Sequence, residues 1–249
     1  MMALLDVENL QVSFGGATAL RGITLSVEHG EAVAILGANG AGKSTLLRAL
    51  MGRVRCAAGA VRWKGADITN ASTPDLIQRG LALCPEGRQL FQAMSVEDNL
   101  LLGAHLASSR EARERLEDIY QRFPLLSKRR RELAGGFSGG EQQMIAIGRS
   151  LMSKPQLLLM DEPSSGLSPI AIGYVRDILL QVRETGMAIL IVEQNVRLAT
   201  EMSRRCYVLN RGLIEAEGPT DKLVQDPALA DAFIGGVLTE PLSSPTPQS

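Results

Sequence analysis

The chain has 249 residues, 45% of them hydrophobic and 21% charged, so it can bury a substantial core. Its formal net charge of -1 argues against a nucleic-acid-binding protein, and it contains no apolar run of the roughly 20 residues that span a bilayer. The first residues lack the features of a signal peptide. The three cysteines lie far apart, which argues against a zinc site or a disulfide framework. Together these features indicate a soluble protein of a reducing compartment.

The first predicted strands alternate between apolar and polar residues. Residues 10–14 and 23–27 show this pattern, which is typical of half-buried strands, and a glycine-bearing turn separates them. The later apolar runs are continuous, as expected of a parallel sheet that helices cover on both faces. These runs are residues 32–37, 81–86, 156–162 and 188–194.

Helical periodicity lies between these runs, so strands and helices alternate as in α/β proteins. The predicted helices are residues 44–51, 170–184 and 196–204. Between residues 86 and 135 the spacing is helical and no strand is predicted. We interpret this region as a helical insertion, about residues 88–150, within an α/β core.

The C-terminal part contains a predicted hairpin that turns at residues 210–212. One domain is therefore expected over residues 1–236. Residues 237–249 contain three prolines and few apolar residues, so this tail is predicted to be disordered.

A glycine-rich loop, GANGAGKST at residues 37–45, fits the pattern Gly-x-x-x-x-Gly-Lys-[Ser/Thr] between a predicted strand and a predicted helix. Its backbone N–H groups and the helix N-terminus can bind phosphates. Lys43 can reach the β- and γ-phosphates, and the Ser44 hydroxyl can bind Mg²⁺. The alternative is a glycine turn that only joins strand to helix. The loop residues expected to bind the nucleotide are Gly37, Asn39, Gly40, Gly42, Lys43, Ser44 and Thr45.

Two acidic residues end the apolar run at 156–162. Asp161 can hold the Mg²⁺ shell, and Glu162 can point to the position of an attacking water. A capping acid before Pro163 is the alternative. Together with the phosphate loop, this pair predicts nucleotide hydrolysis.

A second anion site is predicted in FSGGEQQ, residues 137–143. A serine and two glycines open a predicted helix there and expose backbone N–H groups at its N-terminus. The alternative is a glycine N-cap of a core helix. Because this loop is far along the chain from Lys43, a dimer would bring Ser138, Gly139 and Gly140 of one chain onto a phosphate bound by the other.

These motifs, in this order and with LLLMDEPSSGLSP, resemble those of the ATPase subunits of ABC transporters over roughly residues 4–236. PEGRQLFQAMSVEDNL and VEQN further resemble one of the two ATPase subunits of the branched-chain amino acid importers, whose relatives serve urea, amides and other small polar solutes. The resemblance implies a P-loop NTPase fold with a mainly parallel sheet, an N-terminal antiparallel β-subdomain and a helical insertion.

The same resemblance implies an ATPase that uses ATP and Mg²⁺ to drive uptake, bound peripherally to the cytoplasmic face of a bacterial inner membrane. Its implied partners are a second ATPase subunit (a different chain or another copy), two membrane-spanning permease subunits and, indirectly, an external solute-binding protein, with no nucleic acid. The solute itself is not readable from this chain, because ATPase subunits do not touch it.

Individual roles follow from the matching positions. Phe14 occupies the position of an aromatic residue that stacks on adenine, although a core aromatic in a sheet is an equal alternative. Residues 138–140 would hold the γ-phosphate of ATP bound mainly by the partner. Glu162 would polarise the attacking water, and residues 86–94 would touch the membrane-embedded subunit.

The chain also departs from the usual pattern. Glu86 replaces a glutamine; it only accepts hydrogen bonds, but it can help to bind Mg²⁺ through a water. Glu141 and Ser168 replace a glutamine and an aspartate. Gln194 replaces a histidine that bonds the γ-phosphate, at the end of a strand that points into the ligand crevice. We predict that Gln194 senses the γ-phosphate through neutral hydrogen bonding; a neutral strand-end cap is the alternative.

Three other classes compete with a transport ATPase. A soluble ABC ATPase acting on DNA or ribosomes usually adds a coiled coil or a second cassette, and neither heptads nor an internal repeat is present. A slow-hydrolysing ATP clamp in an asymmetric pair is suggested by Glu86 and Gln194. A small-molecule kinase shares the phosphate loop, but its mechanism does not require the FSGGE motif.

Overall fold

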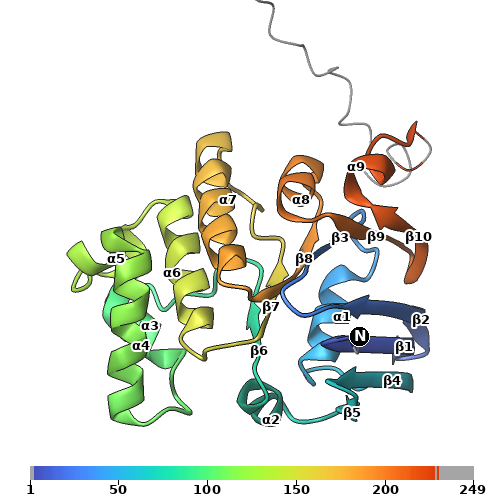
Figure 1. Ribbon diagram of the computed structural model, residues 1–249, viewed down its shortest axis with the longest axis horizontal. Helices are drawn as coiled ribbons and strands as arrows, with labels where there is room; N and C mark the ends of the chain where they lie inside the picture. The colour runs from blue at the N-terminus through green and yellow to red at the C-terminus, as the bar shows by residue number, and fades with distance from the viewer. Residues whose placement is uncertain (1–2, 228, 230–249) are drawn as a thin grey trace, which may run out of the picture.

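Two β-sheets organise the chain in the computed structural model, which describes residues 3–227 and 229 (Figure 1). The larger sheet has the strand order β10-β9-β3-β8-β7-β6. Its strands are β3 (Ala32–Leu36), β6 (Leu81–Cys84), β7 (Leu157–Asp161), β8 (Ala188–Glu193), β9 (Arg205–Asn210) and β10 (Leu213–Pro219). The smaller sheet, of order β2-β1-β4-β5, contains β1 (Leu5–Phe14), β2 (Ala17–Val27), β4 (Ala58–Trp63) and β5 (Ala66–Asp67).

The larger sheet is parallel from β6 to β9, and only β10 runs antiparallel, to β9. The β9–β10 pair confirms the predicted hairpin at residues 210–212. Every residue of β3, β7 and β8 is buried, as their continuous apolar runs predict. Because these strands are parallel, their carboxyl ends meet at one edge of the sheet, where the predicted site residues follow them.

Two hydrophobic cores lie against opposite faces of this sheet. In β3, Ala34 and Leu36 pack into the core formed with α6, α7 and α8, whereas Val33 and Ile35 pack into the core formed with α1 and the smaller sheet. Alternate residues of a strand point to opposite faces. Both faces are therefore covered, and each fully buried leucine or isoleucine contributes roughly 1.5–3 kcal/mol.

The predicted helices are all present, together with short ones near residues 73–78 and 220–223 that were not predicted. They are α1 (Lys43–Leu50), α2 (Thr73–Gln78), α3 (Val96–Leu102), α4 (Ser109–Arg122), α5 (Pro124–Lys128), α6 (Gly139–Leu151), α7 (Pro169–Glu184), α8 (Val196–Met202) and α9 (Thr220–Leu223), with a 3₁₀ turn η1 at Ala134–Gly136. The predicted helices at 44–51 and 170–184 are confirmed to within one residue, and α8 ends two residues early. None of the helices that the structure describes is long and apolar enough to cross a membrane.

The segment between β6 and β7 is helical, as predicted, and lies apart from the smaller sheet (Figure 1). Leu116, Ile119 and Tyr120 of α4 are buried against α3 and α6, which confirms the stripe that their spacing predicts. The boundaries of a domain at 1–236 and of an insertion at 88–150 stay predictions, and the tail at 237–249 lies outside the described residues.

Candidate nucleotide-binding site

The phosphate loop leaves β3 and turns sharply into α1. A Cβ atom on Gly37 would lie 2.3 Å from the Leu209 carbonyl oxygen of β9, so this position has room only for glycine. Gly42 has a φ of 111°, a conformation that L side chains rarely adopt, and helix α1 begins at the next residue. The two glycines therefore let the loop fold tightly over the sheet edge and aim the N-terminus of α1 into the site.

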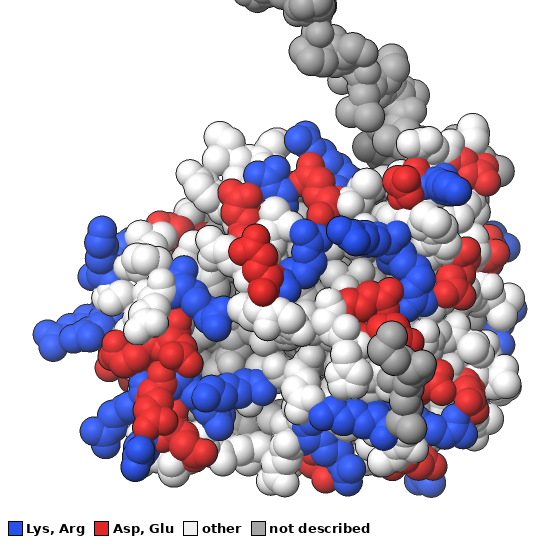
Figure 2. Space-filling model, viewed as in Figure 1, with Lys and Arg blue, Asp and Glu red and all other residues white. Residues whose placement is uncertain are grey.

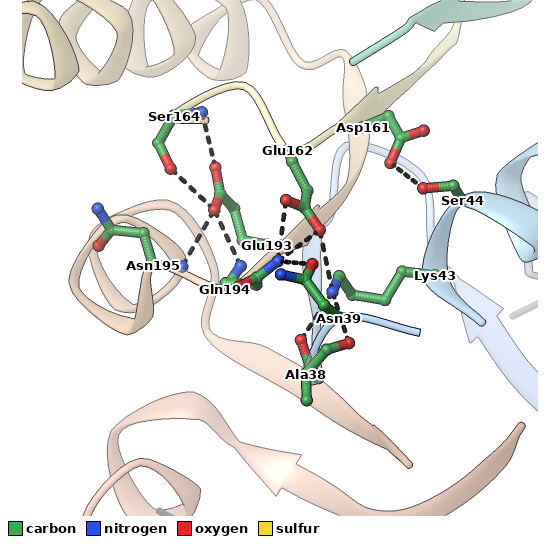
Figure 3. Close-up of polar contacts among 11 residues, drawn as sticks. Ala38, Asn39, Lys43, Ser44, Asp161, Glu162, Ser164, Glu193, Gln194 and Asn195 are labelled. Carbon is green, nitrogen blue, oxygen red and sulfur yellow. Dashed lines mark hydrogen bonds and ion pairs between the residues drawn. The ribbon is translucent and has the colours of Figure 1, made fainter. Parts of the chain in front are cut away.

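Lys43 is the buried cation of the site. Its side chain is 3% exposed, and Nζ donates to the carbonyl oxygens of Gly37 at 2.7 Å and Ala38 at 3.0 Å. Nζ also lies 3.0 Å from Glu162 Oε1 (Figure 3). The structure thus brings the predicted phosphate-binding lysine and the predicted catalytic carboxylate into direct contact.

The predicted metal ligands lie beside this pair. Ser44 Oγ donates to Asp161 Oδ1 at 2.9 Å, which joins the start of α1 to the end of β7. Burial raises the pKa of the Asp161 carboxyl, the carboxylates of Glu86 and Glu162 act in the same direction, and the Ser44 hydrogen bond opposes them. A divalent cation would relieve this crowding of negative charge.

The donor set fits Mg²⁺ held jointly by protein and nucleotide. Among the described residues, no group of three or more His, Cys, Asp or Glu side chains is arranged to hold a metal by itself. Mg²⁺ is usually bound by one or two protein oxygens together with phosphates and waters. Ser44 and Asp161 supply such oxygens, and Glu86 lines the same cleft.

Gln194 reaches into the site from the end of β8. Its Nε2 donates to both carboxylate oxygens of Glu162 at 3.1 Å and also to Asn39 Oδ1 of the phosphate loop (Figure 3). The cap of the following helix is a different residue, because Asn195 Oδ1 accepts from the Leu198 N–H. The Gln194 amide therefore connects the phosphate loop with Glu162, and its function as a γ-phosphate sensor stays a prediction.

Glu162 itself has an unusual backbone. Its φ of 45° is left-handed, which is uncommon for a residue other than glycine. Its N–H donates to the Val192 carbonyl oxygen of β8 at 3.0 Å, and its carbonyl oxygen accepts from Ser165 at the same distance. Such a conformation persists only where its surroundings hold it, and it occurs often at functional sites.

An open cleft with a volume of about 400 Å³ lies along the phosphate loop and Glu162; Asp161 and Gln194 are not among the residues that line it. It is lined by Thr18, Ala19, Arg21, Asn39, Gly40, Gly42, Lys43, Ser44, Thr45, Glu86, Glu162 and Arg211. Arg21 and Arg211 were not predicted from the sequence. They reach the cleft because the β9–β10 turn bonds to both the loop and β2. The Gly212 N–H donates to the Ala41 carbonyl oxygen at 2.8 Å, and the Gly212 carbonyl oxygen accepts from the Arg21 N–H at 2.8 Å.

Phe14 is not a core aromatic. It is 50% exposed at the end of β1, so the core alternative is wrong, and it is not among the residues that line the cleft. Its stacking on adenine stays a prediction. On the face shown in Figure 2, basic and acidic side chains are interspersed around the molecule.

The second anion site opens α6. Ser138 is the N-cap: its Oγ accepts from the Glu141 N–H, and its own N–H donates to Glu141 Oε2 at 2.8 Å. Glu141 also pairs with Arg129 at 2.9 Å, which gives a structural reason for a glutamate at this position. Ser138, Gly139 and Gly140 are absent from the cleft lining. Within one chain, the structure therefore does not bring this loop and the phosphate loop together.

The segment that follows β6 is held in a strained form. Gly87, Arg88 and Gln89 all have positive φ values, and Arg149 of α6 donates to the carbonyl oxygens of Arg88 at 2.9 Å and Gln89 at 2.8 Å. A groove of about 340 Å³ lies alongside, and it includes Phe91, which is 57% exposed. Arg149 thus ties the last turn of α6 to the segment that starts at Glu86.

Comparison with protein families decides the class of this site. Residues 20–165 match the family model described as "ABC transporter". The chain belongs to the ABC transporter family. It resembles the "High-affinity branched-chain amino acid transport ATP-binding protein BraG" of Pseudomonas aeruginosa, with 39% identity over 94% of this chain and 100% of the relative.

More distant relatives of this ABC ATPase subunit serve another process. The "Lipopolysaccharide export system ATP-binding protein LptB" of Haemophilus influenzae is 30% identical over 94% of this chain and 98% of the relative. Among solved structures, the ADP conformation of MJ1267, "an ATP-binding cassette of an ABC transporter", has a TM-score of 0.87 and 30% identity, covering 94% of this chain and 100% of the other. The predicted fold and the predicted class, an ABC transporter ATPase, are confirmed.

Proposed function

We propose that this subunit binds and hydrolyses Mg²⁺-ATP in the cleft at the carboxyl ends of β3, β7 and β8, and that it thereby energises uptake of branched-chain amino acids or a related small polar solute. One observation carries the proposal: Lys43, the Ser44–Asp161 pair and the Glu162–Gln194 pair meet at one sheet edge. The solute class is supported by the 39% identity to the branched-chain amino acid protein.

In this proposal, Lys43 exchanges its contact with Glu162 for the β- and γ-phosphates. Nζ needs only a local movement, because it already lies beside the loop carbonyls of Gly37 and Ala38. Ser44 and Asp161 would hold Mg²⁺, which when bound neutralises charge on the phosphates. Glu162, released from Lys43, then faces the cleft with its carboxylate still bonded to Gln194.

Glu162 polarises the attacking water in this account, and Gln194 fixes its orientation. The amide of Gln194 donates to both oxygens of Glu162, so it fixes the orientation of the side chain that would accept a proton from water. A glutamine side chain carries no titratable proton. Gln194 therefore serves as a neutral hydrogen-bond donor between Glu162, the loop and the γ-phosphate.

A complete catalytic unit would need two ATPase chains. Ser138–Gly140 lie outside the cleft of their own chain, which supports a role on the nucleotide of a partner, either a different subunit or a second copy. The groove beside Phe91 is a suitable contact for one of two membrane-spanning permease subunits, because it combines exposed apolar surface with the segment that Arg149 ties to α6. An external solute-binding protein would act on those permeases.

The test is reconstitution. The tagged full-length chain is purified with its membrane partners from a bacterial inner membrane and placed in vesicles with the ATP site and ATP enclosed. The external solute-binding protein is added outside, and uptake of labelled leucine is measured. We expect uptake that requires ATP and stops in Glu162→Gln. Copurification with no membrane subunit, or ATP-driven transport confined to lipopolysaccharide, would contradict the proposal. Unequal single-turnover rates at the two sites would instead indicate a clamp role for this chain.

A further inference from the structure

Glu193, the last residue of β8, is a buried carboxylate that the predicted mechanism does not use. It is 1% exposed. Its Oε1 accepts from the Ser164 N–H at 2.9 Å, and its Oε2 accepts from Ser164 Oγ at 2.9 Å, from the Gln194 N–H at 3.0 Å and from the Asn195 N–H at 3.1 Å (Figure 3). One side chain thus receives four hydrogen bonds from two separate segments.

Both segments carry residues of the ATP site. Ser164 lies two positions after Glu162, in the turn that follows β7, and Gln194 is the residue next to Glu193. We infer that Glu193 is a positioning residue for ATP hydrolysis: its carboxylate holds the turn of Glu162 and the backbone of Gln194 in one fixed relation. This inference rests on the proposed roles of Glu162 and Gln194.

The geometry explains why such a support is needed. Glu162 has a left-handed φ of 45°, which must be held by its surroundings. The Glu162 N–H bonds to the Val192 carbonyl oxygen at 3.0 Å, and two residues further on the Glu193 carboxylate bonds to Ser164. The end of β8 therefore fastens the turn at two successive points, once through its backbone and once through a side chain.

The chemistry of Glu193 also fits this role better than a packing role. The preceding residues of β8 are apolar and buried, and an apolar residue would avoid the desolvation of a carboxylate. Burial raises the pKa of the Glu193 carboxyl, while the hydrogen bonds from Asn195, Ser164 and Gln194 oppose that rise. All four contacts are donors, so an acceptor-only carboxylate satisfies them and an amide would not.

The experiment compares kcat, KM for ATP and the melting temperature in the full-length chain assembled with its partners. In Glu193→Gln, the new NH₂ group opposes a donor and releases the turn, so we expect kcat to fall by about 10- to 100-fold, with KM changed less than about twofold. The matched control is Glu31→Gln. Glu31 directly precedes β3, and its partly buried carboxylate accepts from the Glu28 N–H and from Arg205. It should lower the melting temperature and leave kcat unchanged.

Ser164 supplies a second variant, which serves if Glu193→Gln does not fold. Ser164→Ala removes one of the four bonds and should lower kcat less than Glu193→Gln does, whereas Ser164→Thr keeps the hydroxyl and should retain wild-type turnover. Because both residues act through one contact, the double variant Glu193→Gln/Ser164→Ala should be no slower than Glu193→Gln alone.

The outcomes separate the inference from the proposed function. Wild-type kcat in both Glu193→Gln and Ser164→Ala, with Glu162→Gln inactive, would overturn the positioning role alone. Equal kcat losses in Glu193→Gln and the control Glu31→Gln would also overturn the positioning role, because Glu193 would then contribute only to the overall stability of the fold. Full turnover in Glu162→Gln would instead overturn the proposed site itself.

Discussion

The buried pair of Lys43 and Glu162 gives the sharpest prediction. Replacing Glu162 by Gln keeps the size of the side chain and removes its charge. At an effective dielectric constant of about 20, unit charges 3.0 Å apart attract by roughly 5.5 kcal/mol, much of which desolvation offsets. Lys43 keeps its two carbonyl acceptors, so we expect the nucleotide-free chain to lose about 2 kcal/mol of unfolding free energy, below the roughly 3–5 kcal/mol of a fully buried pair.

ATP binding should change in the opposite direction. In the wild type, ATP must take Lys43 from Glu162 and approach a negative carboxylate, and the Gln variant removes both obstacles. We expect ATP to bind at least about tenfold more tightly, which corresponds to about 1.4 kcal/mol.

Urea unfolding without nucleotide and calorimetric titration with ATP measure the two effects. The matched control is Glu114→Gln on α4, whose carboxylate is 58% exposed and pairs, among the residues that the structure describes, with exposed Arg110. That variant should leave both quantities within about 0.5 kcal/mol of the wild type. A Glu162→Gln chain with wild-type stability and wild-type ATP affinity would refute the reasoning.

Three further predictions concern Gln194, Glu31 and the thiols. Gln194→Ala loses the donor shared by Glu162 and Asn39, so turnover should fall about tenfold with little change in stability. If ATP hydrolysis and ATP-dependent dimer closure were both unchanged, Gln194 would not belong to the site. Burial opposes ionisation of Glu31, but hydrogen bonds from Arg205 and the Glu28 N–H hold its pKa below the ordinary value of about 4.3. Glu31→Gln should therefore lose about 1 kcal/mol of unfolding free energy at pH 7, and this difference from the wild type should vanish as the pH falls through the pKa of the folded state. A difference that does not depend on pH would contradict the assignment. All three cysteines are buried and form no disulfide, and burial raises the pKa of Cys84 to about 11. A thiol reagent should therefore react slowly with the native chain and should modify three thiols after unfolding. Rapid reaction with the native chain would refute this prediction.

The sequence predicted the parallel core because local composition carries that information. The runs that precede Gly37, Asp161 and Glu193 are apolar throughout, and their strands are buried on both faces. Strands β4 and β5 and helix α2 were not predicted, because each is short and offers few residues to a periodic pattern. The position of β8 between β3 and β7 depends on pairing across the sheet, which no local pattern encodes.

The site was predictable where a motif occupies consecutive residues and unpredictable where distant segments meet. Lys43, Ser44 and Asp161 follow from motifs, and the structure brings them together. The bonds between Ser164 and Glu193 join residues 29 positions apart, and the only signal was a glutamate at the end of an apolar run. Arg211 enters the cleft through the fold of a hairpin turn, which its sequence neighbours do not reveal.

The rate of ATP hydrolysis in Glu162→Gln tests the central claim most directly. The full-length chain is assembled with its partners, and steady-state phosphate release is measured at saturating Mg²⁺-ATP beside wild type and Glu114→Gln. If Glu162 polarises the attacking water in the cleft that Lys43 and Ser44 line, turnover at this chain's site falls by at least about 100-fold while ATP still binds. Turnover at this site within twofold of wild type would contradict the account.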